Sequence, residues 1–279
     1  MPDLRNQYTP ARAVQCHNQK AMPAAVITGA STGIGREFAY LCARDGYDLF
    51  LVARSLPQLE ALASEIRQQT GRAAQVIPTD LSDAAGPRHI FAEISRTGLP
   101  VEILINNAGF GLTGRFWELD EAEQMGMIQL NIGALTDLTR LFLPGFIERR
   151  RGRVLNVAST AAFQPGPLMS VYYATKAYVV SFSEAVHQEA RDFGVTVTTL
   201  CPGPTRTEFD KRAGATGTRL FNTGRVMDAG SVASIGYKAM KSGKPLVIAG
   251  RMNALMAFLT RFASIQLTAS MAHRFNRAD

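Results

Sequence analysis

The sequence predicts an α/β protein whose parallel sheet is covered by helices on both faces. From residue 24 onward, short apolar runs alternate with segments in which apolar residues recur at helical spacing. Strands that are apolar throughout are typical of parallel sheets buried on both sides. The chain has 279 residues, of which 46% are hydrophobic and 19% charged, enough apolar side chain for one large core.

The expected strands are the short apolar runs, and the expected helices lie between them. The strands are 24–28, 49–53, 73–78, 103–106, 154–158, 195–201 and 246–249. The helices run from the glycine-rich turn after residue 28 to about 44, and over 56–69, 89–96, 120–149, 171–192 and 231–241. Asp120 is expected to cap helix 120–149, with Glu123 in the capping-box position, and Gly194 to end helix 171–192.

We expect three parts: a flexible arm over 1–23, one domain over 24–250 and a helical extension over 251–279. The arm lacks the continuous apolar core of a signal peptide, and no uncharged apolar run reaches the ~18–20 residues that cross a bilayer. Residues 252–275 form an apolar, basic stretch of helical character, with no acid before Asp279. Such a segment packs on the core or on a partner subunit, or lies on an anionic membrane surface as a peripheral contact. We favour packing, because apolar helical stripes usually face a core.

The overall charge leaves several classes of partner open. The net charge is +7, and the densest basic cluster is Arg149, Arg150, Arg151 and Arg153. We interpret the cluster as the basic end of a helix and expect no nucleic-acid partner, because no aromatic residues are interleaved with it. The three cysteines are too far apart for a disulfide framework, which favours a reducing, cytoplasmic compartment, and no metal site is predicted.

A glycine-rich turn follows the first strand and opens the first helix. It contains Gly29, Ser31, Thr32, Gly33, Ile34 and Gly35. A strand, a glycine turn and a helix N-terminus together aim backbone N–H groups at a pyrophosphate. We expect Gly29 to allow the tight turn, Gly33 the approach of the phosphates, and Gly35 the close packing of helix on sheet.

The same residues also match the nucleophile elbow of serine hydrolases. Gly29-Ala30-Ser31-Thr32-Gly33 has the G-x-S-x-G pattern, which likewise lies between a strand and a helix. An elbow needs upstream strands to supply an oxyanion loop, and here it follows the first strand. We therefore favour the phosphate loop.

The residues after the second and third strands indicate the cofactor. An acid about 20 residues past the glycines would bind the ribose 2′-hydroxyl of NAD, but this chain has Ala53 and Arg54. Arginine binds a phosphate through two hydrogen bonds, so NADP(H) is predicted; the alternative is an exposed arginine at a strand end. Asp80 and Leu81 are expected to meet the adenine, and Asp80 also fits a helix N-cap.

A tyrosine and a lysine four residues apart form the candidate catalytic pair. Tyr172 and Lys176 would share one face of helix 171–192. An ammonium beside a phenol stabilises the phenolate and would lower the pKa of Tyr172 toward neutrality, making it a usable acid or base. Ser159, just past the fifth strand, is placed to hold a substrate oxygen; alone, it would be interpreted as a loop or N-cap serine.

Taken together and in this order, these motifs resemble the short-chain dehydrogenase/reductase superfamily over residues 24–250. The motifs are the glycine loop, Asn106-Asn107-Ala108-Gly109, Asn131, Ser159, Tyr172-x-x-x-Lys176 and Pro202-Gly203. The resemblance implies a Rossmann-type, three-layer αβα fold with a doubly wound parallel sheet of seven strands in the order 3-2-1-4-5-6-7. It also implies a homodimer or homotetramer formed through helices 120–149 and 171–192.

The resemblance further implies a role for each site residue. Tyr172 is the general acid or base, Lys176 lowers its pKa and binds the nicotinamide ribose, and Ser159 polarises the substrate carbonyl. Asn131 anchors a water that connects Lys176 to solvent. The other cofactor contacts implied are Asn107, Ala108 and Gly109 on the adenosine side and Pro202, Gly203, Thr205 and Thr207 at the nicotinamide end. The family often has a branched apolar residue where this chain has Thr205.

The expected activity is hydride transfer between NADP(H) and a carbonyl or alcohol group of a small molecule. Residues 206–227 are expected to form a lid over an apolar pocket, so a ketone, steroid-like or 3-oxoacyl substrate is favoured over a sugar. A non-catalytic NADPH-binding sensor on the same fold is the alternative. The complete set of Asn131, Ser159, Tyr172 and Lys176 argues against it, since a sensor needs no catalytic residues.

Overall fold

The structure is a computed structural model that describes residues 22–209, 213–214 and 226–277. Most of the expected arm, and of the expected lid over 206–227, lies outside the described residues. The strands are β1 (Ala24–Thr28), β2 (Asp48–Ala53), β3 (Ala74–Pro78), β4 (Val101–Asn106), β5 (Gly152–Val157), β6 (Val195–Cys201), β7 (Thr205–Arg206), β8 (Met227–Asp228) and β9 (Leu246–Ile248). The main helices are α1 (Gly33–Arg44), α2 (Leu56–Thr70), α3 (Gly86–Arg96), α4 (Glu121–Ile128), α5 (Leu135–Glu148), α6 (Ser170–Ala190), α9 (Ala229–Lys241), α10 (Arg251–Leu259) and α11 (Ile265–Asn276).

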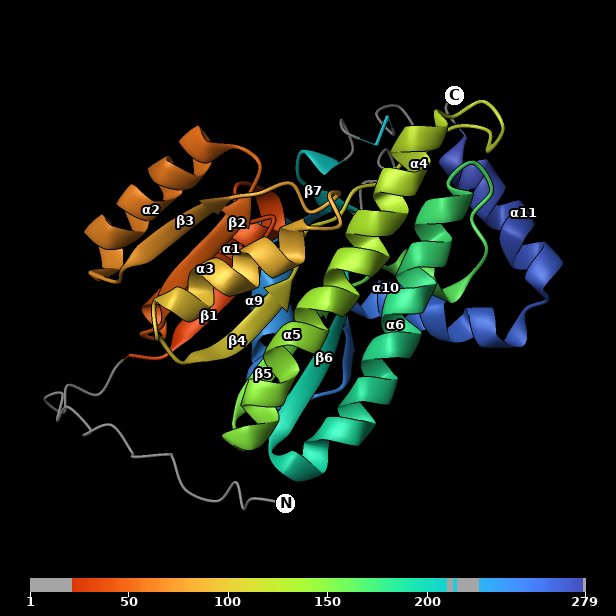
Figure 1. The fold of residues 1–279 in the computed structure, drawn as a ribbon. Helices are drawn as coiled ribbons and strands as arrows, with labels where there is room; N and C mark the ends of the chain where they lie inside the picture. Colours follow the sequence, from red (N-terminus) through yellow and green to blue (C-terminus); the bar gives the residue numbers. More distant parts are fainter. Residues whose placement is uncertain (1–21, 210–212, 215–225, 278–279) are drawn as a thin grey trace, which may run out of the picture.

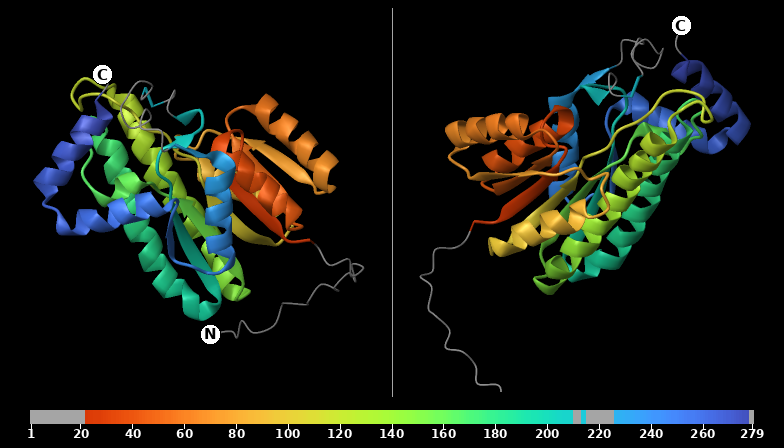
Figure 2. Two further views of the ribbon diagram at one scale, coloured as in Figure 1. Left: turned by 180° about the vertical axis from the view of Figure 1, so that it is seen from behind. Right: turned by 45° about the horizontal axis from the view of Figure 1, so that its top comes forward.

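Seven parallel strands form one sheet in the order β3-β2-β1-β4-β5-β6-β9. The predicted doubly wound, Rossmann-type order is therefore confirmed. The short parallel pair of β7 and β8 was not predicted; it lies between β6 and β9 along the chain. Figure 1 shows α3, α5 and α6 in front of the sheet, and Figure 2 shows α9 and α1 on the opposite face.

Two apolar layers flank the sheet, because alternate residues of each strand point to opposite faces. In β1, Ala25 and Ile27 pack with α1, α2 and α9, whereas Ala24 and Val26 pack with α3, α5 and α6. All five residues of β1 are buried. This double burial is the physical reason for uniformly apolar strands in the sequence.

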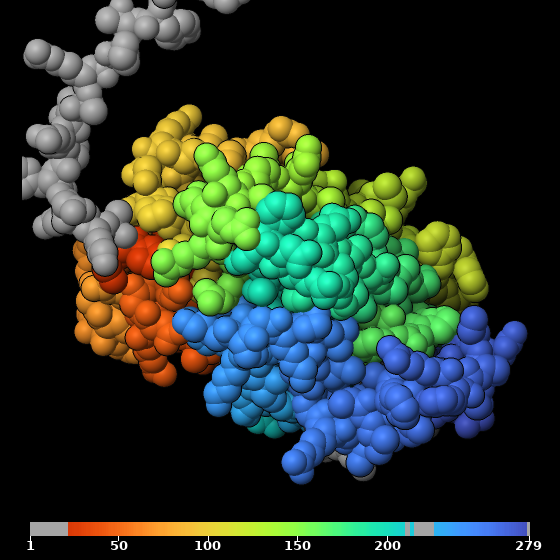
Figure 3. Space-filling view, turned by 90° about the horizontal axis from the view of Figure 1, so that it is seen from below, coloured from red at the N-terminus to blue at the C-terminus, as the bar shows by residue number. Residues whose placement is uncertain are grey.

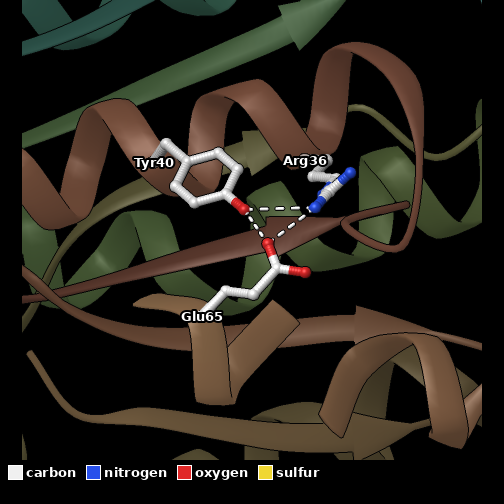
Figure 4. Close-up of polar contacts among 3 residues, drawn as sticks. All are labelled: Arg36, Tyr40 and Glu65. Carbon is white, nitrogen blue, oxygen red and sulfur yellow. Dashed lines mark hydrogen bonds and ion pairs between the residues drawn. The ribbon is translucent and has the colours of Figure 1, made fainter. Parts of the chain in front are cut away.

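Polar contacts fix the outer helices. Arg36 and Tyr40 of α1 both bind Glu65 of α2, and the Arg36 Nη2 to Glu65 Oε2 distance is 2.6 Å (Figure 4). The hydrogen bond from Tyr40, followed by that from Arg36, lowers the pKa of Glu65, so the carboxylate stays charged and keeps the two helices joined.

Two arginines of the basic cluster make contacts within the fold. Arg149 donates to the Val101 carbonyl at 2.9 Å, and Arg151 lies 3.1 Å from Glu102. Part of the positive charge of the cluster therefore has a structural role.

Two predicted helices differ from the structure. Asp120 does cap α4 by accepting from the Glu123 amide, but the expected continuous helix 120–149 is interrupted by a π-helical turn, η1 (Gln129–Ala134). The extension forms two helices, α10 and α11, joined by a 3₁₀ turn, η4 (Thr260–Phe262), and a cap at Ser264. Of the described residues, no helix is both long and apolar enough to span a bilayer.

Candidate active site

A cavity of about 1230 Å³ lies at the carboxyl edge of the sheet, where ligands bind in open parallel sheets. Segments after β1 to β6 line it, together with parts of α6, α10 and α11. Among the predicted site residues, Gly35 and Asn131 lie behind the lining and the others form part of it. The cavity reaches from Arg54 to Tyr172, which gives room for a dinucleotide beside a substrate.

The glycine loop presents the N-terminus of α1 to this cavity. Gly29 and Gly33 have φ values of 65° and 56°, a conformation that favours glycine. The first turn of α1 carries no acidic residue, so its free N–H groups and helix dipole favour an anion. Gly35 supports the loop from behind, since a Cβ there would lie 2.2 Å from the Gly29 carbonyl oxygen.

Asn107 joins the ends of β1 and β4 beneath the loop. Its Nδ2 donates to the carbonyl oxygens of Thr28 at 3.0 Å and Gly29 at 3.2 Å. The Thr28 hydroxyl accepts from the amides of Asn107 and Ala108, both at 3.0 Å. These bonds fix the position of the glycine loop relative to the centre of the sheet.

Arg54 lines the far end of the cavity, away from Tyr172 and Lys176. Its Nη1 lies 3.8 Å from Asp80 Oδ2, and its side chain is 68% exposed, so the guanidinium remains available to a ligand. Partial burial raises the pKa of Asp80, but hydrogen bonds from Ser82 and the charge of Arg54 outweigh it and lower that pKa overall. Asp80 is not the N-cap of α3, which begins at Gly86; it accepts from the Ser82 amide and hydroxyl instead.

Tyr172, Ser159 and Lys176 meet at the other end of the cavity. Ser159 lies near enough to Tyr172 to lower the pKa of its phenol, and Ser159 Oγ accepts from the Ala161 amide at 3.1 Å. Ser159 is thus both the N-cap of a 3₁₀ turn, η2 (Thr160–Phe163), and a neighbour of the tyrosine. Lys176 Nζ donates to the Val157 carbonyl at 2.9 Å and lies 5.8 Å from the centre of the Tyr172 ring.

The expected lowering of the Tyr172 pKa is not found. Burial raises the pKa of Tyr172 above its usual value, and the nearby Ser159 opposes this only in part. Burial also lowers the pKa of Lys176 to about 8. The physical reason is that the Lys176 ammonium binds the end of β5 rather than the phenol, while both groups are out of water.

Asn131 lies in the π-helical turn and is 1% exposed. Its Nδ2 donates to the Phe110 carbonyl and to Thr175 Oγ1, both at 3.0 Å, and its Oδ1 accepts from the Phe110 amide at 3.2 Å. Asn131 therefore ties the segment after β4 to α6, one residue before Lys176. The water assigned to it by resemblance stays a prediction.

Residues of the extension reach the site and were missed by the sequence analysis. Asn276 of α11 accepts from the Tyr173 hydroxyl at 3.2 Å and donates to the Pro167 carbonyl at 3.0 Å. Asn253 of α10 packs against Gly203, where a Cβ would lie 2.4 Å from its Nδ2. The one signal in the sequence that could have indicated these contacts is the presence of asparagines in an otherwise apolar helical stretch.

The cavity wall near the tyrosine is largely apolar. It includes Met252, Met256, Leu259, Met271 and Phe275 from the extension, and Phe110, Met169 and Phe209 from the domain. Of the expected lid, Phe209 is described, and its ring centre lies 5.4 Å from that of Tyr172.

The described residues contain no cluster of three histidine, cysteine or acidic side chains able to hold a metal ion. His187, a histidine downstream of Ser31, is buried, and its Nδ1 lies 2.8 Å from the Val197 carbonyl oxygen on β6. The two cysteines within the described ranges, Cys42 and Cys201, are free and buried.

Residues 23–217 match the family model described as short chain dehydrogenase. The match covers more than half of the chain, so the chain belongs to the short-chain dehydrogenase/reductase superfamily of oxidoreductases. The resemblance inferred from the motifs is confirmed, and the serine hydrolase alternative is excluded.

Curated relatives share about a third of their aligned residues with the chain. It is 34% identical over 204 residues to 17-beta-hydroxysteroid dehydrogenase type 3 of Rattus norvegicus, covering 72% of this chain and 63% of the relative. It is 36% identical over 175 residues to very-long-chain 3-oxoacyl-CoA reductase of Laccaria bicolor, covering 62% of this chain and 52% of the relative. The chain thus spans less than two thirds of the length of these relatives.

Solved structures of similar proteins carry either nicotinamide cofactor. A short-chain dehydrogenase from Sphingobium yanoikuyae in complex with NADPH is 32% identical, with a TM-score of 0.76, covering 86% of this chain and 95% of that one. A short-chain dehydrogenase/reductase from Burkholderia phymatum in complex with NAD is 25% identical, with a TM-score of 0.77, covering 89% and 95%.

Proposed function

We propose that the chain is an NADP(H)-dependent oxidoreductase that interconverts a carbonyl and an alcohol on an apolar substrate. The observation that carries the proposal is one continuous cavity with Arg54 at one end and Tyr172, Ser159 and Lys176 at the other. A helix N-terminus suited to an anion lies between them. The donor set therefore fits a dinucleotide that carries an extra phosphate.

When bound, the nicotinamide supplies the hydride that reduces the substrate carbon. Ser159 Oγ holds the carbonyl oxygen beside Tyr172, and the Tyr172 hydroxyl donates its proton to that oxygen as negative charge develops. The products are the alcohol and a tyrosinate, which regains its proton from solvent. In oxidation the tyrosinate removes the hydroxyl proton instead.

Lys176 and Asn131 position this reaction. Because burial raises the pKa of Tyr172, the phenol form predominates, which suits a proton donor in reduction. Lys176 is cationic below about pH 8, and its charge favours the tyrosinate once the proton has left. Asn131 keeps the start of α6 in place through Thr175.

The preference for NADP over NAD rests on Arg54. The residue before it is Ala53, so no carboxylate at the end of β2 repels a 2′-phosphate. A guanidinium that is two-thirds exposed binds such a phosphate with little loss of other contacts. The NADPH-bound structure from Sphingobium yanoikuyae supports this preference, whereas the NAD-bound relative is why it needs a direct test.

We propose a ketone, steroid-like or 3-oxoacyl substrate. Methionine and phenylalanine side chains of α10 and α11 widen the apolar end of the cavity, and flexible methionines accommodate long apolar molecules. The relatives named for a hydroxysteroid and for very-long-chain 3-oxoacyl-CoA support the same classes.

A homodimer or homotetramer formed through α5 and α6 completes the proposal. The two helices lie side by side on one face of the molecule (Figure 1), and Thr136 Oγ1 lies 3.0 Å from the Tyr178 hydroxyl between them. Tyr178 and Phe182 stack there with ring centres 5.7 Å apart, which gives a partly apolar surface for a second copy.

The test is cofactor consumption by the full chain with NADPH and, separately, NADH. The panel contains aromatic ketones, steroids and 3-oxoacyl thioesters of graded chain length. Oxidation of NADPH that depends on one of these classes supports the proposal and identifies the substrate. Tight NADPH binding without turnover on any class contradicts it and favours the sensor.

A further inference from the structure

The two helices of the extension bury small and polar side chains, whereas a helix in contact with water usually buries its large apolar ones. In α11, the buried residues are Thr268, Ala272 and Asn276, a narrow stripe four residues apart. In α10, Ala257 is the buried residue. An ordinary surface helix buries its large apolar side chains and exposes its small and polar ones, so this arrangement is inverted.

The large apolar side chains of this segment are exposed instead. They form what we call the apolar patch: Leu255, Phe258, Phe262, Ile265 and Leu267. Phe262 is 75% exposed and Ile265 70%. The rings of Phe258 and Phe262 contact each other with centres 5.2 Å apart, which joins α10 to the turn that follows it. Figure 3 shows the extension, in the darkest blue, as one continuous region at one end of the molecule.

The charge of this region has one sign. Residues 251–277 contain four arginines and no aspartate or glutamate. They are Arg251, Arg261, Arg274 and Arg277. Exposed apolar side chains with arginines among them match the two components of an anionic lipid surface, which are acyl chains and negatively charged headgroups.

A second copy of the chain fits this region less well. In a two-fold contact, each surface meets the same surface of its partner. The arginines of the two copies would then lie close together, without any carboxylate in 251–277 to pair with them.

The cavity opens beside the apolar patch. Four residues of its wall, Met256, Leu259, Met271 and Phe275, are themselves 42% to 48% exposed, so the wall formed by α10 and α11 reaches the surface. A lipid surface in contact with the patch would therefore lie next to the cavity entrance.

We propose that α10, η4 and α11 dock the protein on an anionic membrane surface, through the apolar patch and the surrounding arginines. Docking itself is independent of the proposed catalysis. If the proposed function also holds, an apolar substrate dissolved in the bilayer enters the cavity without crossing water.

The experiment is flotation of the full chain with vesicles of phosphatidylcholine alone, or of equal amounts of phosphatidylcholine and phosphatidylglycerol. We expect binding to the anionic vesicles that weakens as salt is added. Phe262→Ser and Ile265→Ser should each lower the partition coefficient by about tenfold or more. Arg261→Gln and Arg274→Gln should each lower it by about fivefold.

Phe193→Ser is the matched control, because Phe193 is also exposed but lies in the 3₁₀ turn that follows the last residue of α6, whereas α11 contacts α6 near its first residues, at Tyr173. It should bind vesicles as the native chain does, and all variants should keep the native unfolding temperature. The proposal is overturned if the native chain does not float with anionic vesicles, or if Phe193→Ser loses as much vesicle binding as Phe262→Ser. It is also overturned if the patch variants turn a dimer into a monomer while vesicle binding is unchanged, since a second copy would then be the occupant.

Discussion

Adding a single methyl group at Gly35 should both destabilise the protein and weaken cofactor binding. A Cβ at this position would lie 2.2 Å from the Gly29 carbonyl oxygen and 2.5 Å from Asn107 Nδ2. Unbonded heavy atoms keep a separation of more than about 3 Å, so the loop or α1 must shift by about 1 Å. Forcing such a group into a packed interior costs about 1–3 kcal/mol of unfolding free energy.

The shift moves the residues that we propose face the cofactor phosphates. Gly29 begins the loop, so a displaced Gly29 misaligns the N–H groups at the N-terminus of α1. Losing one hydrogen bond to a charged group costs about 1.5–3 kcal/mol, so the Kd for NADPH should rise by roughly tenfold or more.

Gly126→Ala is the matched control for Gly35→Ala. Gly126 lies inside α4, and a Cβ there would meet only the Cβ of Ser82, at 3.9 Å. Alanine should therefore stabilise the protein by about 0.5–1 kcal/mol. Urea denaturation and a fluorescence titration with NADPH measure both effects. The reasoning is refuted if Gly35→Ala unfolds at the native urea concentration and binds NADPH with the native Kd.

Three further substitutions test other parts of the account. Arg54→Ala should raise the Kd for NADPH about tenfold and leave that for NADH unchanged; isothermal titration that shows equal losses would exclude the 2′-phosphate role. Lys176→Met tests the burial of the Lys176 ammonium. The pKa of Lys176 is about 8 in the folded protein and about 10.5 in the unfolded chain, so between pH 8 and 10.5 the unfolded chain binds more protons than the folded one. The stability of the native chain should therefore rise relative to Lys176→Met as the pH increases from 8 to 10.5, and a constant difference in urea titrations would argue against this burial. Asn276→Ala removes the hydrogen-bond partner of both the Tyr173 hydroxyl and the Pro167 carbonyl, and it should lower the unfolding free energy by about 1–3 kcal/mol in thermal denaturation. No change would mean that α11 does not stabilise the segment around Pro167.

The sheet could be predicted because its signals are local. An apolar run such as 24–28 is short and bounded by a glycine turn, and the order of the motifs gave the family and with it the strand order. The part of the cavity lining that belongs to the domain was predictable for the same reason, since most of those residues follow directly after a strand. The N-cap of α4 at Asp120 was also predictable, because Asp120 and Glu123 have the spacing of a capping box.

Other features depend on contacts between distant residues and left no local signal. The π-helical turn places Asn131 against Phe110 and Thr175, and neither partner is near it in sequence. The inverted burial of α11 was invisible in its periodicity, because the stripe that packs is made of threonine, alanine and asparagine. The pKa of Tyr172 was expected to fall, but burial raises it. The direction of the shift depends on the contact of the Lys176 ammonium, which binds the Val157 carbonyl rather than the phenol.

The central claim is that the Tyr172 hydroxyl supplies the proton in carbonyl reduction. The most direct measurement compares NADPH oxidation by the native chain, Tyr172→Phe and Tyr173→Phe, on the best substrate of the panel, together with the NADPH Kd of each. Tyr173 is the matched control, because it is also buried but donates to Asn276. The account predicts that Tyr172→Phe loses at least about 10²–10⁴-fold in kcat and keeps NADPH binding, while Tyr173→Phe stays active. Native turnover by Tyr172→Phe would contradict it.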